Sequence, residues 1–202
     1  DCPAGSFGSE TGLTACANCT SGNWCGEGSS APTPCGPGNY SNQLGLRSAD
    51  ECLRCPEGSW CSAGRAIPCG LGTYNDALGA TDQSSCTYCP PNSFTDGERK
   101  TSLADCICNA GYFSRWSSGT LACETCPVHA NCSVPGATLA HLPLKEGHWR
   151  VNAQTTDVRR CQGRADGSVC VGCSGADCAA ASATGCKPGT EGPYCRLCAA
   201  VN

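Results

Sequence analysis

Apolar side chains are sparse in this chain and recur at fixed places, without the periodic runs that predict long helices or strands. In five stretches, a cysteine is followed three residues later by glycine or asparagine and five residues later by an aromatic residue. We number these stretches copies 1 to 5; they begin at Cys2, Cys35, Cys69, Cys89 and Cys108. Mostly polar residues then lead to the next cysteine. This arrangement predicts short two-stranded hairpins and turns with almost no helix.

The residue three positions after the first cysteine of each copy fits a turn with positive φ, where a Cβ atom is unfavourable. Copy 4 carries asparagine there, a residue that tolerates this conformation. We therefore predict positive φ at Gly5, Gly38, Gly72 and Asn92. The aromatic residue of each copy is predicted to lie across the neighbouring disulfide, as the main apolar group of a small core. These residues are Phe7, Tyr40, Tyr74, Phe94 and Phe113.

The sixteen cysteines up to residue 132 can all pair with their nearest neighbours, without remainder. The predicted bridges are Cys2–Cys16, Cys19–Cys25, Cys35–Cys52, Cys55–Cys61, Cys69–Cys86, Cys89–Cys106, Cys108–Cys123 and Cys126–Cys132. Crossed pairings that link each C-x-x-C pair to the next module remain open, because sequence alone does not define connectivity.

Composition explains why so many bridges are needed. Leu, Ile, Val and Phe make up about 12% of the 202 residues, below the roughly 20% at which a chain lacks enough apolar surface to fold by burial. Cysteine contributes 23 residues. Closing a loop of about 15 residues stabilises a protein by about 3 kcal/mol. The predicted fold class is therefore small and disulfide-rich: an elongated array of cystine-stapled β-hairpin modules with little helix.

Several motifs resemble known extracellular modules. The C-P-x-G-x-aromatic opening followed by C-x-x-C resembles the cysteine-rich repeats of ephrin-receptor ectodomains and, more loosely, of tumour-necrosis-factor receptors. Residues 106–123 and the string CKPGTEGPYCRLC are similar to EGF-like modules, with Cys186–Cys195 as the closing pair of the second. The run GHWRVNAQTTDVRRC before that string is similar to segments of large surface proteins of algae and protists. The resemblance implies fold and an extracellular setting rather than a function.

These observations divide the chain into six segments. They are 1–34 (cysteine-rich repeat 1), 35–68 (repeat 2), 69–88 (a short repeat 3), 89–132 (repeats 4 and 5, EGF-like), 133–160 (a cysteine-free hairpin segment) and 161–202 (an EGF-like C-terminal module).

The cysteine density indicates an oxidising compartment, so we expect an extracellular or cell-surface protein. Sequons at Asn18, Asn39 and Asn131 predict N-linked glycans. The net charge of −4 does not favour a nucleic-acid partner. No apolar run is as long as a membrane span. The chain has no Met and no visible signal peptide, which suggests a processed chain or a piece of one.

The cysteine-free segment 133–160 contains Trp149 and several basic residues. One interpretation is a hairpin that packs Trp149 onto the adjacent modules with its charges solvated. The other is a contact surface for an acidic partner or a glycan, formed by Trp149, Arg150, Arg159 and Arg160. We predict that this surface contributes to a contact, because a narrow module has little room to bury it. The seven cysteines after residue 160 cannot all pair with one another, so one is unpaired. We assign it to Cys198 and expect it to lie near a contact with another module or another chain.

No residues form a pattern typical of catalysis. The cluster Cys126, His129 and Cys132 is the one place to examine for zinc, and the residues 48–51 only partly resemble a calcium-binding EGF motif. We predict no cofactor, no metal and no enzymatic activity. The preferred function is an extracellular structural protein, a glycosylated building block of a filament, coat or flagellar hair that associates with copies of itself or with other extracellular proteins. The alternative is a ligand-binding or spacer ectodomain of a receptor or channel.

Overall fold

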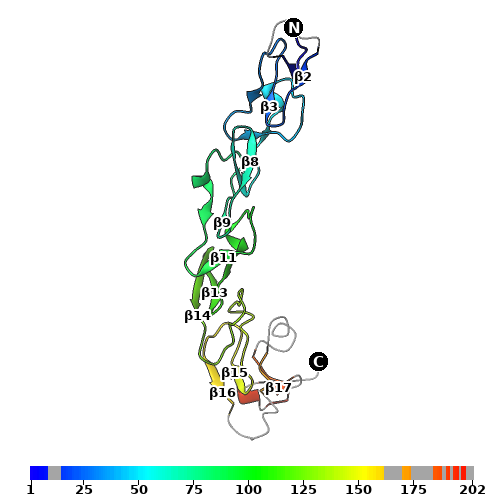
Figure 1. Ribbon diagram of the computed structural model, residues 1–202. Helices are drawn as coiled ribbons and strands as arrows, with labels where there is room; N and C mark the ends of the chain where they lie inside the picture. Colours follow the sequence, from blue (N-terminus) through cyan, green and yellow to red (C-terminus); the bar gives the residue numbers. More distant parts are fainter. Residues whose placement is uncertain are drawn as a thin grey trace. The chain divides into compact units, whose positions relative to one another are not determined.

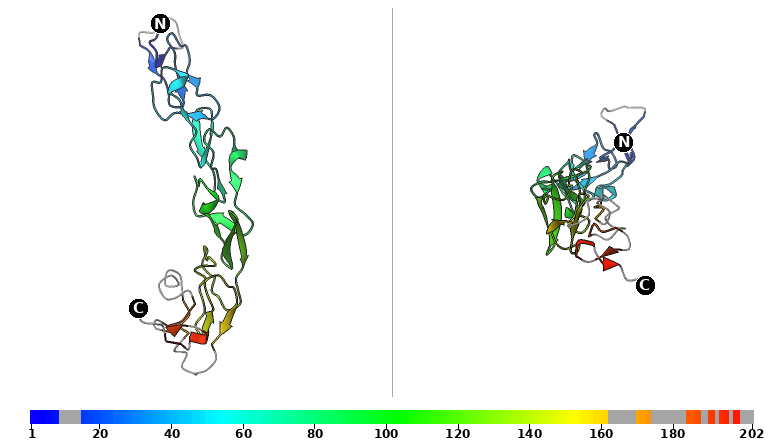
Figure 2. Two further views of the ribbon diagram at one scale, coloured as in Figure 1. Left: turned by 180° about the vertical axis from the view of Figure 1, so that it is seen from behind. Right: turned by 90° about the horizontal axis from the view of Figure 1, so that it is seen from below.

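The computed structural model describes residues 1–8, 15–161, 170–173, 184–187, 190–191, 193–195 and 197–198. The chain divides into two compact units (Figure 1). Unit 1 comprises Asp1–Cys89 and Thr95–Cys106, and unit 2 comprises Pro90–Phe94 and Ile107–Asn202. The strands of the described residues lie in short pairs and form no larger sheet (Figure 1 and Figure 2, left). The predicted disulfide-rich array of β-hairpin modules is confirmed.

Unit 1 contains five antiparallel hairpins of two to four residues per strand. They are β1 (Ser6–Phe7) with β2 (Ala17–Asn18), β3 (Asn23–Trp24) with β4 (Thr33–Pro34), β5 (Asn39–Tyr40) with β6 (Leu53–Arg54), β7 (Ser59–Ser62) with β8 (Arg65–Pro68), and β9 (Thr73–Tyr74) with β10 (Thr87–Tyr88). Between the strands lie three single-turn 3₁₀ helices: η1 (Ala49–Glu51), η2 (Gln83–Ser85) and η3 (Leu103–Asp105).

Unit 2 has the longest hairpin, β13 (Tyr112–Ser117) with β14 (Thr120–Thr125). It also contains β15 (His148–Arg150) with β16 (Val158–Arg160), β17 (Thr190–Glu191) with β18 (Leu197–Cys198), and η4 (Pro193–Cys195). Strand β11 (Ser93–Thr95) pairs with β12 (Cys106–Cys108). Each of these hairpins falls inside one of the six segments predicted from the sequence.

The disulfides join the sixteen cysteines of the array in the eight neighbouring pairs that the spacing predicted. Their Cα–Cα separations lie between 5.6 and 5.9 Å, within the normal range for a bridge. The crossed pairings do not form. The bridges Cys161–Cys170 and Cys186–Cys195 follow in unit 2, and Cys173 is also disulfide-bonded. The side chain of Cys198, the predicted unpaired cysteine, lies outside the described residues.

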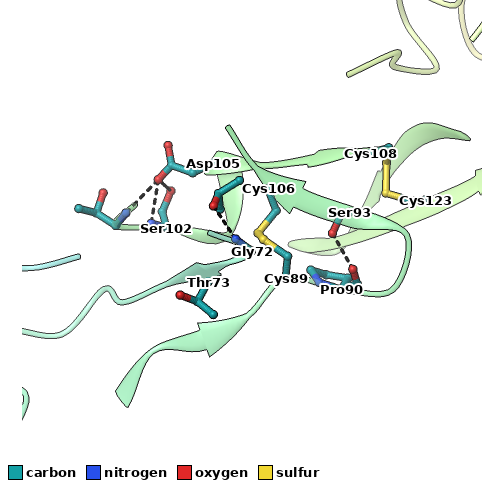
Figure 3. The surroundings of a disulfide bond; sticks show 12 residues. Gly72, Thr73, Cys89, Pro90, Ser93, Ser102, Asp105, Cys106, Cys108 and Cys123 are labelled. Atoms are coloured by element: carbon teal, nitrogen blue, oxygen red, sulfur yellow. Dashed lines mark hydrogen bonds between the residues drawn. A yellow bond between two sulfur atoms is a disulfide. The ribbon is translucent and has the colours of Figure 1, made fainter. Parts of the chain in front are cut away.

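A 3₁₀ turn stands directly before the closing cysteine in copies 2, 3 and 4, and an acidic side chain holds it. In copy 4, the backbone N–H groups of Thr101 and Ser102 both donate to Asp105 Oδ2 at 3.0 Å, beside the Cys89–Cys106 bridge (Figure 3). In copy 3, the N–H of Ser84 donates to Asp82 Oδ1 at 2.9 Å. These bonds satisfy backbone N–H groups at the start of the turn. The turn is thereby held in place, and with it the closing cysteine.

The predicted positive φ is confirmed at every position. It is 91° at Gly5, 72° at Gly38, 77° at Gly72 and 62° at Asn92. A second constraint was not predicted: a Cβ atom on Gly38 would lie 2.5 Å from the carbonyl oxygen of Gly79, and one on Gly5 would lie 2.6 Å from that of Gly45. No atom lies within 4 Å of the corresponding position on Gly72. In copies 1 and 2, glycine is thus required both for its positive φ and because a Cβ atom would clash. In copy 3, it is required only for its φ.

Backbone hydrogen bonds, most of them in both directions, join several loops to later ones. The N–H of the residue after an aromatic donates to a carbonyl about twenty residues further along. These bonds are Gly8 to Ser29 (3.0 Å), Cys25 to Leu46 (2.9 Å), Ser41 to Gly64 (3.1 Å), Cys61 to Ala80 (2.9 Å), Asn75 to Lys100 (3.0 Å) and Ser114 to Ala137 (2.8 Å). In return, an N–H of the later loop donates to the carbonyl of a cysteine. These bonds are Gly28 to Cys2 (2.8 Å), Gly45 to Cys19 (2.8 Å), Gly79 to Cys55 (2.8 Å), Arg99 to Cys69 (3.1 Å) and Gly136 to Cys108 (2.9 Å).

The predicted core of one aromatic ring and its cystines is only partly correct. Phe113 is buried, with 1% of its surface exposed, but the aromatic residues of the other four copies are only half-buried. Among the described residues of unit 1, the buried apolar ones are cysteines apart from Leu46 and Ala80. The small loops are too short to cover a ring, so cystines supply most of the buried apolar surface in the described part of unit 1.

Unit 2 contains two conventional apolar clusters. The first joins Phe113 to residues of the loops that follow it: Ala130, Cys132, Ala137, Leu142 and Leu144. The second surrounds Trp149 and contains Cys170, Cys186 and Cys195. The cysteine-free segment 133–160 contributes to both clusters, which compensates for its lack of covalent bridges.

Candidate functional site

Trp149 lies inside unit 2 rather than on a contact surface. It stands in β15 opposite Arg159 of β16, and 4% of its surface is exposed. It packs against the bridges Cys161–Cys170 and Cys186–Cys195, and these bridges touch each other, with Sγ of Cys170 3.4 Å from Sγ of Cys195. The hairpin interpretation is therefore confirmed for Trp149, and its predicted role in an external contact is wrong. The missing information was the position of the late cystines, which cover the indole.

Arg150 is fully buried, contrary to both interpretations of the segment. Its guanidinium donates to the carbonyl oxygens of Leu139 at 2.6 Å and Ala140 at 2.8 Å, and more weakly to those of Ala153 at 3.4 Å and Thr155 at 3.5 Å. Burial lowers the pKa of Arg150, yet an arginine stays charged even then. The side chain thus ties the loops on both sides of β15 together, and it is structural.

The predicted surface retains only Arg159 and Arg160, which are exposed on β16. Arg159 donates to Asp157 Oδ2 through Nε at 2.8 Å and Nη2 at 2.6 Å. This hydrogen bond and the positive charge of Arg159 lower the pKa of the Asp157 carboxyl group. Two exposed arginines beside a carboxylate form a modest charged edge, so the case for an acidic partner here is weaker than the sequence indicated.

The three sequons differ in exposure. Asn18 and Asn131 are exposed, and Asn39 is half-buried. The amide Nδ2 of Asn39 donates to the carbonyl of Pro37 at 3.3 Å, whereas Oδ1 of Asn131 accepts from the N–H of Ser133 at 3.4 Å. Glycan attachment at Asn18 and Asn131 is sterically open, and it stays a prediction at all three positions.

The cluster Cys126, His129 and Cys132, which the sequence offered as a zinc site, does not form one. Cys126 and Cys132 form a disulfide, so they cannot bind zinc with His129. His129 instead stacks on His148, with ring centroids 4.3 Å apart and the planes inclined by 16°. The sulfur atoms of Cys161, Cys170 and Cys195 lie within 4.8 Å of one another, but all three cysteines are in disulfides. Their proximity reflects packing of two bridges.

An open groove in unit 1 was not predicted. It has a volume of about 980 Å³ and lies between β7, β8, β9, β10 and η2. Trp60, Ile67, Leu71 and Tyr88 supply its apolar surface, and Gln83 and Ser84 of η2 form a polar edge. None of the side chains that line it is charged. Tyr88 is 80% exposed and Leu71 is 69% exposed, so the groove presents large apolar groups to solvent.

A comparison of copies 2 and 3 could have revealed the groove from sequence. Both close a loop of the same length, with a separation of 17 residues between the bridged cysteines. Copy 3 has Tyr88 where copy 2 has Arg54, and Ser84 where copy 2 has Asp50. Because the two loops have the same length and the same bridge, the residues that differ between them are not required for the loop to fold.

Comparisons with known proteins found no family model and no curated protein that matches the chain. The described residues contain no helix that is long and apolar enough to cross a membrane. The number of disulfides is typical of an extracellular or secreted protein.

Proposed function

We propose that the chain is an extracellular structural protein, a glycosylated building block of a filament, coat or flagellar hair. The observation that supports this proposal best is the repeated pair of backbone hydrogen bonds between successive loops, which recurs in both units. Main-chain bonds make few demands on side chains, so such loops can be added in series, as in other repeat proteins. The disulfides provide stability without a large core, which suits a protein that must last outside the cell.

The test is electron microscopy of material from the native source, with an antibody to this chain. We expect the antibody to decorate filaments, a coat or hairs that survive extraction with a mild detergent. Treatment with a glycosidase should lower the apparent mass of the chain if the sequons carry glycans. If the chain is found only as isolated monomers after gentle extraction, the structural proposal is wrong.

The second candidate is a ligand-binding or spacer ectodomain, and the open groove of unit 1 favours it. The same extraction separates the two candidates. An ectodomain should leave the surface with membrane proteins in detergent micelles, whereas a filament or coat should remain in the insoluble fraction. Decoration at isolated points on the membrane would support this candidate.

A further inference from the structure

The apolar residues of the groove are not needed to fold copy 3. In copy 2, the same loop closes with Pro37 in place of Leu71 and Arg54 in place of Tyr88. Exposing large apolar side chains has no benefit for a monomer in water, and clusters of them commonly mark binding sites. The groove therefore has a use other than folding.

The chemistry of the groove fits a sugar. A pyranose ring presents C–H groups on its faces and hydroxyl groups around its edge. The indole of Trp60 and the phenol of Tyr88 offer aromatic faces for the C–H groups, while Gln83 and Ser84 offer an amide and a hydroxyl that both donate and accept hydrogen bonds. Largely apolar walls with a few polar groups are typical of small-ligand sites.

The absence of charged side chains from the lining of the groove favours a neutral ligand. Copy 2 places Asp50, Glu51 and Arg54 at the positions where copy 3 has Ser84, Ser85 and Tyr88. Copy 3 thus has no charged residue at these three positions. The nearest carboxyl group in sequence is Asp82, exposed beside Gln83, and its negative charge disfavours a sulfated or acidic sugar.

From these observations, we propose that the groove between β7, β8, β9, β10 and η2 binds a neutral oligosaccharide. Its volume of about 980 Å³ is at the upper end of small-ligand sites, which favours several linked sugar units over one. The groove is open to solvent, so binding is weak at a single site and becomes useful when many copies of the chain face the same glycan. This inference goes beyond the proposed function, since a coat protein and an ectodomain could each use such a site.

The experiment uses the full 202-residue chain with its disulfides formed, and soluble tetra-N-acetylchitotetraose, cellotetraose and mannotetraose as probes. Tetragalacturonate, a sugar of similar size with negative charges, is the charged control. Binding is followed by isothermal titration and by the ¹H–¹⁵N NMR signals of Gln83, Ser84 and Tyr88. We expect at least one neutral tetrasaccharide to bind in the millimolar range or tighter and to shift these signals, with no shift from tetragalacturonate.

The variants Tyr88→Arg and Gln83→Ala carry the residues of copy 2 and should therefore fold. Tyr88→Arg is expected to weaken binding by about fivefold to tenfold, since an aromatic contact is worth about 1 kcal/mol or slightly more. Trp116→Ala is the matched control, because Trp116 is an aromatic residue of β13 in unit 2 that is 49% exposed. It should bind the sugar unchanged. A disulfide map of each variant verifies the fold.

Three outcomes would overturn the proposal. One is that none of the neutral sugars binds in the millimolar range. Another is that Tyr88→Arg, correctly folded, binds the sugar as well as the original chain does. The third is that Tyr88→Arg leaves sugar binding unchanged but abolishes association between copies of the chain, which would make the groove a protein contact. None of these results depends on whether the chain forms filaments.

Discussion

In unit 1, the buried apolar residues apart from Leu46 and Ala80 are cysteines, whereas unit 2 also buries Phe113, Leu142 and Trp149. The contrast follows the spacing of the bridges. Where disulfides close every loop, covalent closure limits the unfolded chain and a side-chain core is dispensable. The cysteine-free segment 133–160 has no such closure, and it needs two apolar clusters and a buried arginine. One polypeptide thus uses two strategies, and each predicts a different response to mutation.

The strongest test of this contrast is Arg150→Ala in unit 2. The substitution removes a charged donor from the carbonyl oxygens of Leu139 and Ala140 and leaves a cavity. We expect a loss of about 4 kcal/mol in the free energy of unfolding. Hydrogen exchange followed by mass spectrometry should show faster exchange throughout 133–160 and no change in 1–89. Arg160→Ala, at an exposed position of the same hairpin, is the control and should change stability by less than about 0.5 kcal/mol. Equal effects of the two variants would contradict the structural role of Arg150.

The corresponding test in unit 1 removes a bridge. The double variant Cys35→Ser, Cys52→Ser opens a loop with a sequence separation of 17 residues. It should cost about 3 kcal/mol by the chain-entropy estimate. Because the buried apolar residues described in unit 1 are mostly cysteines, we expect the amides of residues 35–55 to lose protection while 107–160 keep theirs. Loss of protection in both units would show that they fold as one cooperative body.

A smaller effect distinguishes two glycines with similar φ. Gly38→Asn would bring a Cβ atom within 2.5 Å of the carbonyl oxygen of Gly79, so we expect a loss of about 2 kcal/mol. Gly72→Asn meets no atom within 4 Å and copies what copy 4 has at Asn92, so it should cost about 0.5 kcal/mol. Thermal unfolding of the two variants provides the measurement. Similar midpoints would mean that the approach of Gly79 is not a constraint.

The smallest predicted effects concern the stability at low pH. Here one exposed carboxyl group of unit 1 can be compared with one of unit 2. Hydrogen bonds from Ser84 lower the pKa of Asp82 in unit 1, and the bond from Arg159 lowers that of Asp157 in unit 2. A folded-state pKa below the ordinary value means that each group contributes stability above about pH 4. That contribution is lost as the pH falls through the folded-state pKa. In an NMR titration, Ser84→Ala should raise the pKa of Asp82 alone, and Arg159→Ala should raise that of Asp157 alone. A shift of both groups in one variant would contradict these local causes.

The sequence was a good guide to the bridged loops of residues 1–132 and a poorer guide to the cysteine-free segment 133–160, for a physical reason. Local spacing defines a bridge over a short loop, so the eight neighbouring pairs and the φ of Asn92 could be predicted. The burial of Arg150 depends on loops on both sides of β15, and the covering of Trp149 depends on cystines that come later in the chain. Neither leaves a local pattern. The groove could not be predicted from the repeat pattern, because its residues, such as Tyr88, stand at positions where the copies differ.

The bridges that close the loops also determine how the chain responds to tension. When the two ends of the segment 1–132 are pulled apart, each S–S bond transmits the force past the loop that it closes. The residues inside the loop then carry no tension. Only the links between consecutive bridges can lengthen, and those from Cys16 to Cys19, Cys52 to Cys55 and Cys86 to Cys89 contain two residues each. Each residue adds at most about 3.6 Å when fully extended. The array therefore acts as a strap of limited extensibility, even after its hydrogen bonds have broken.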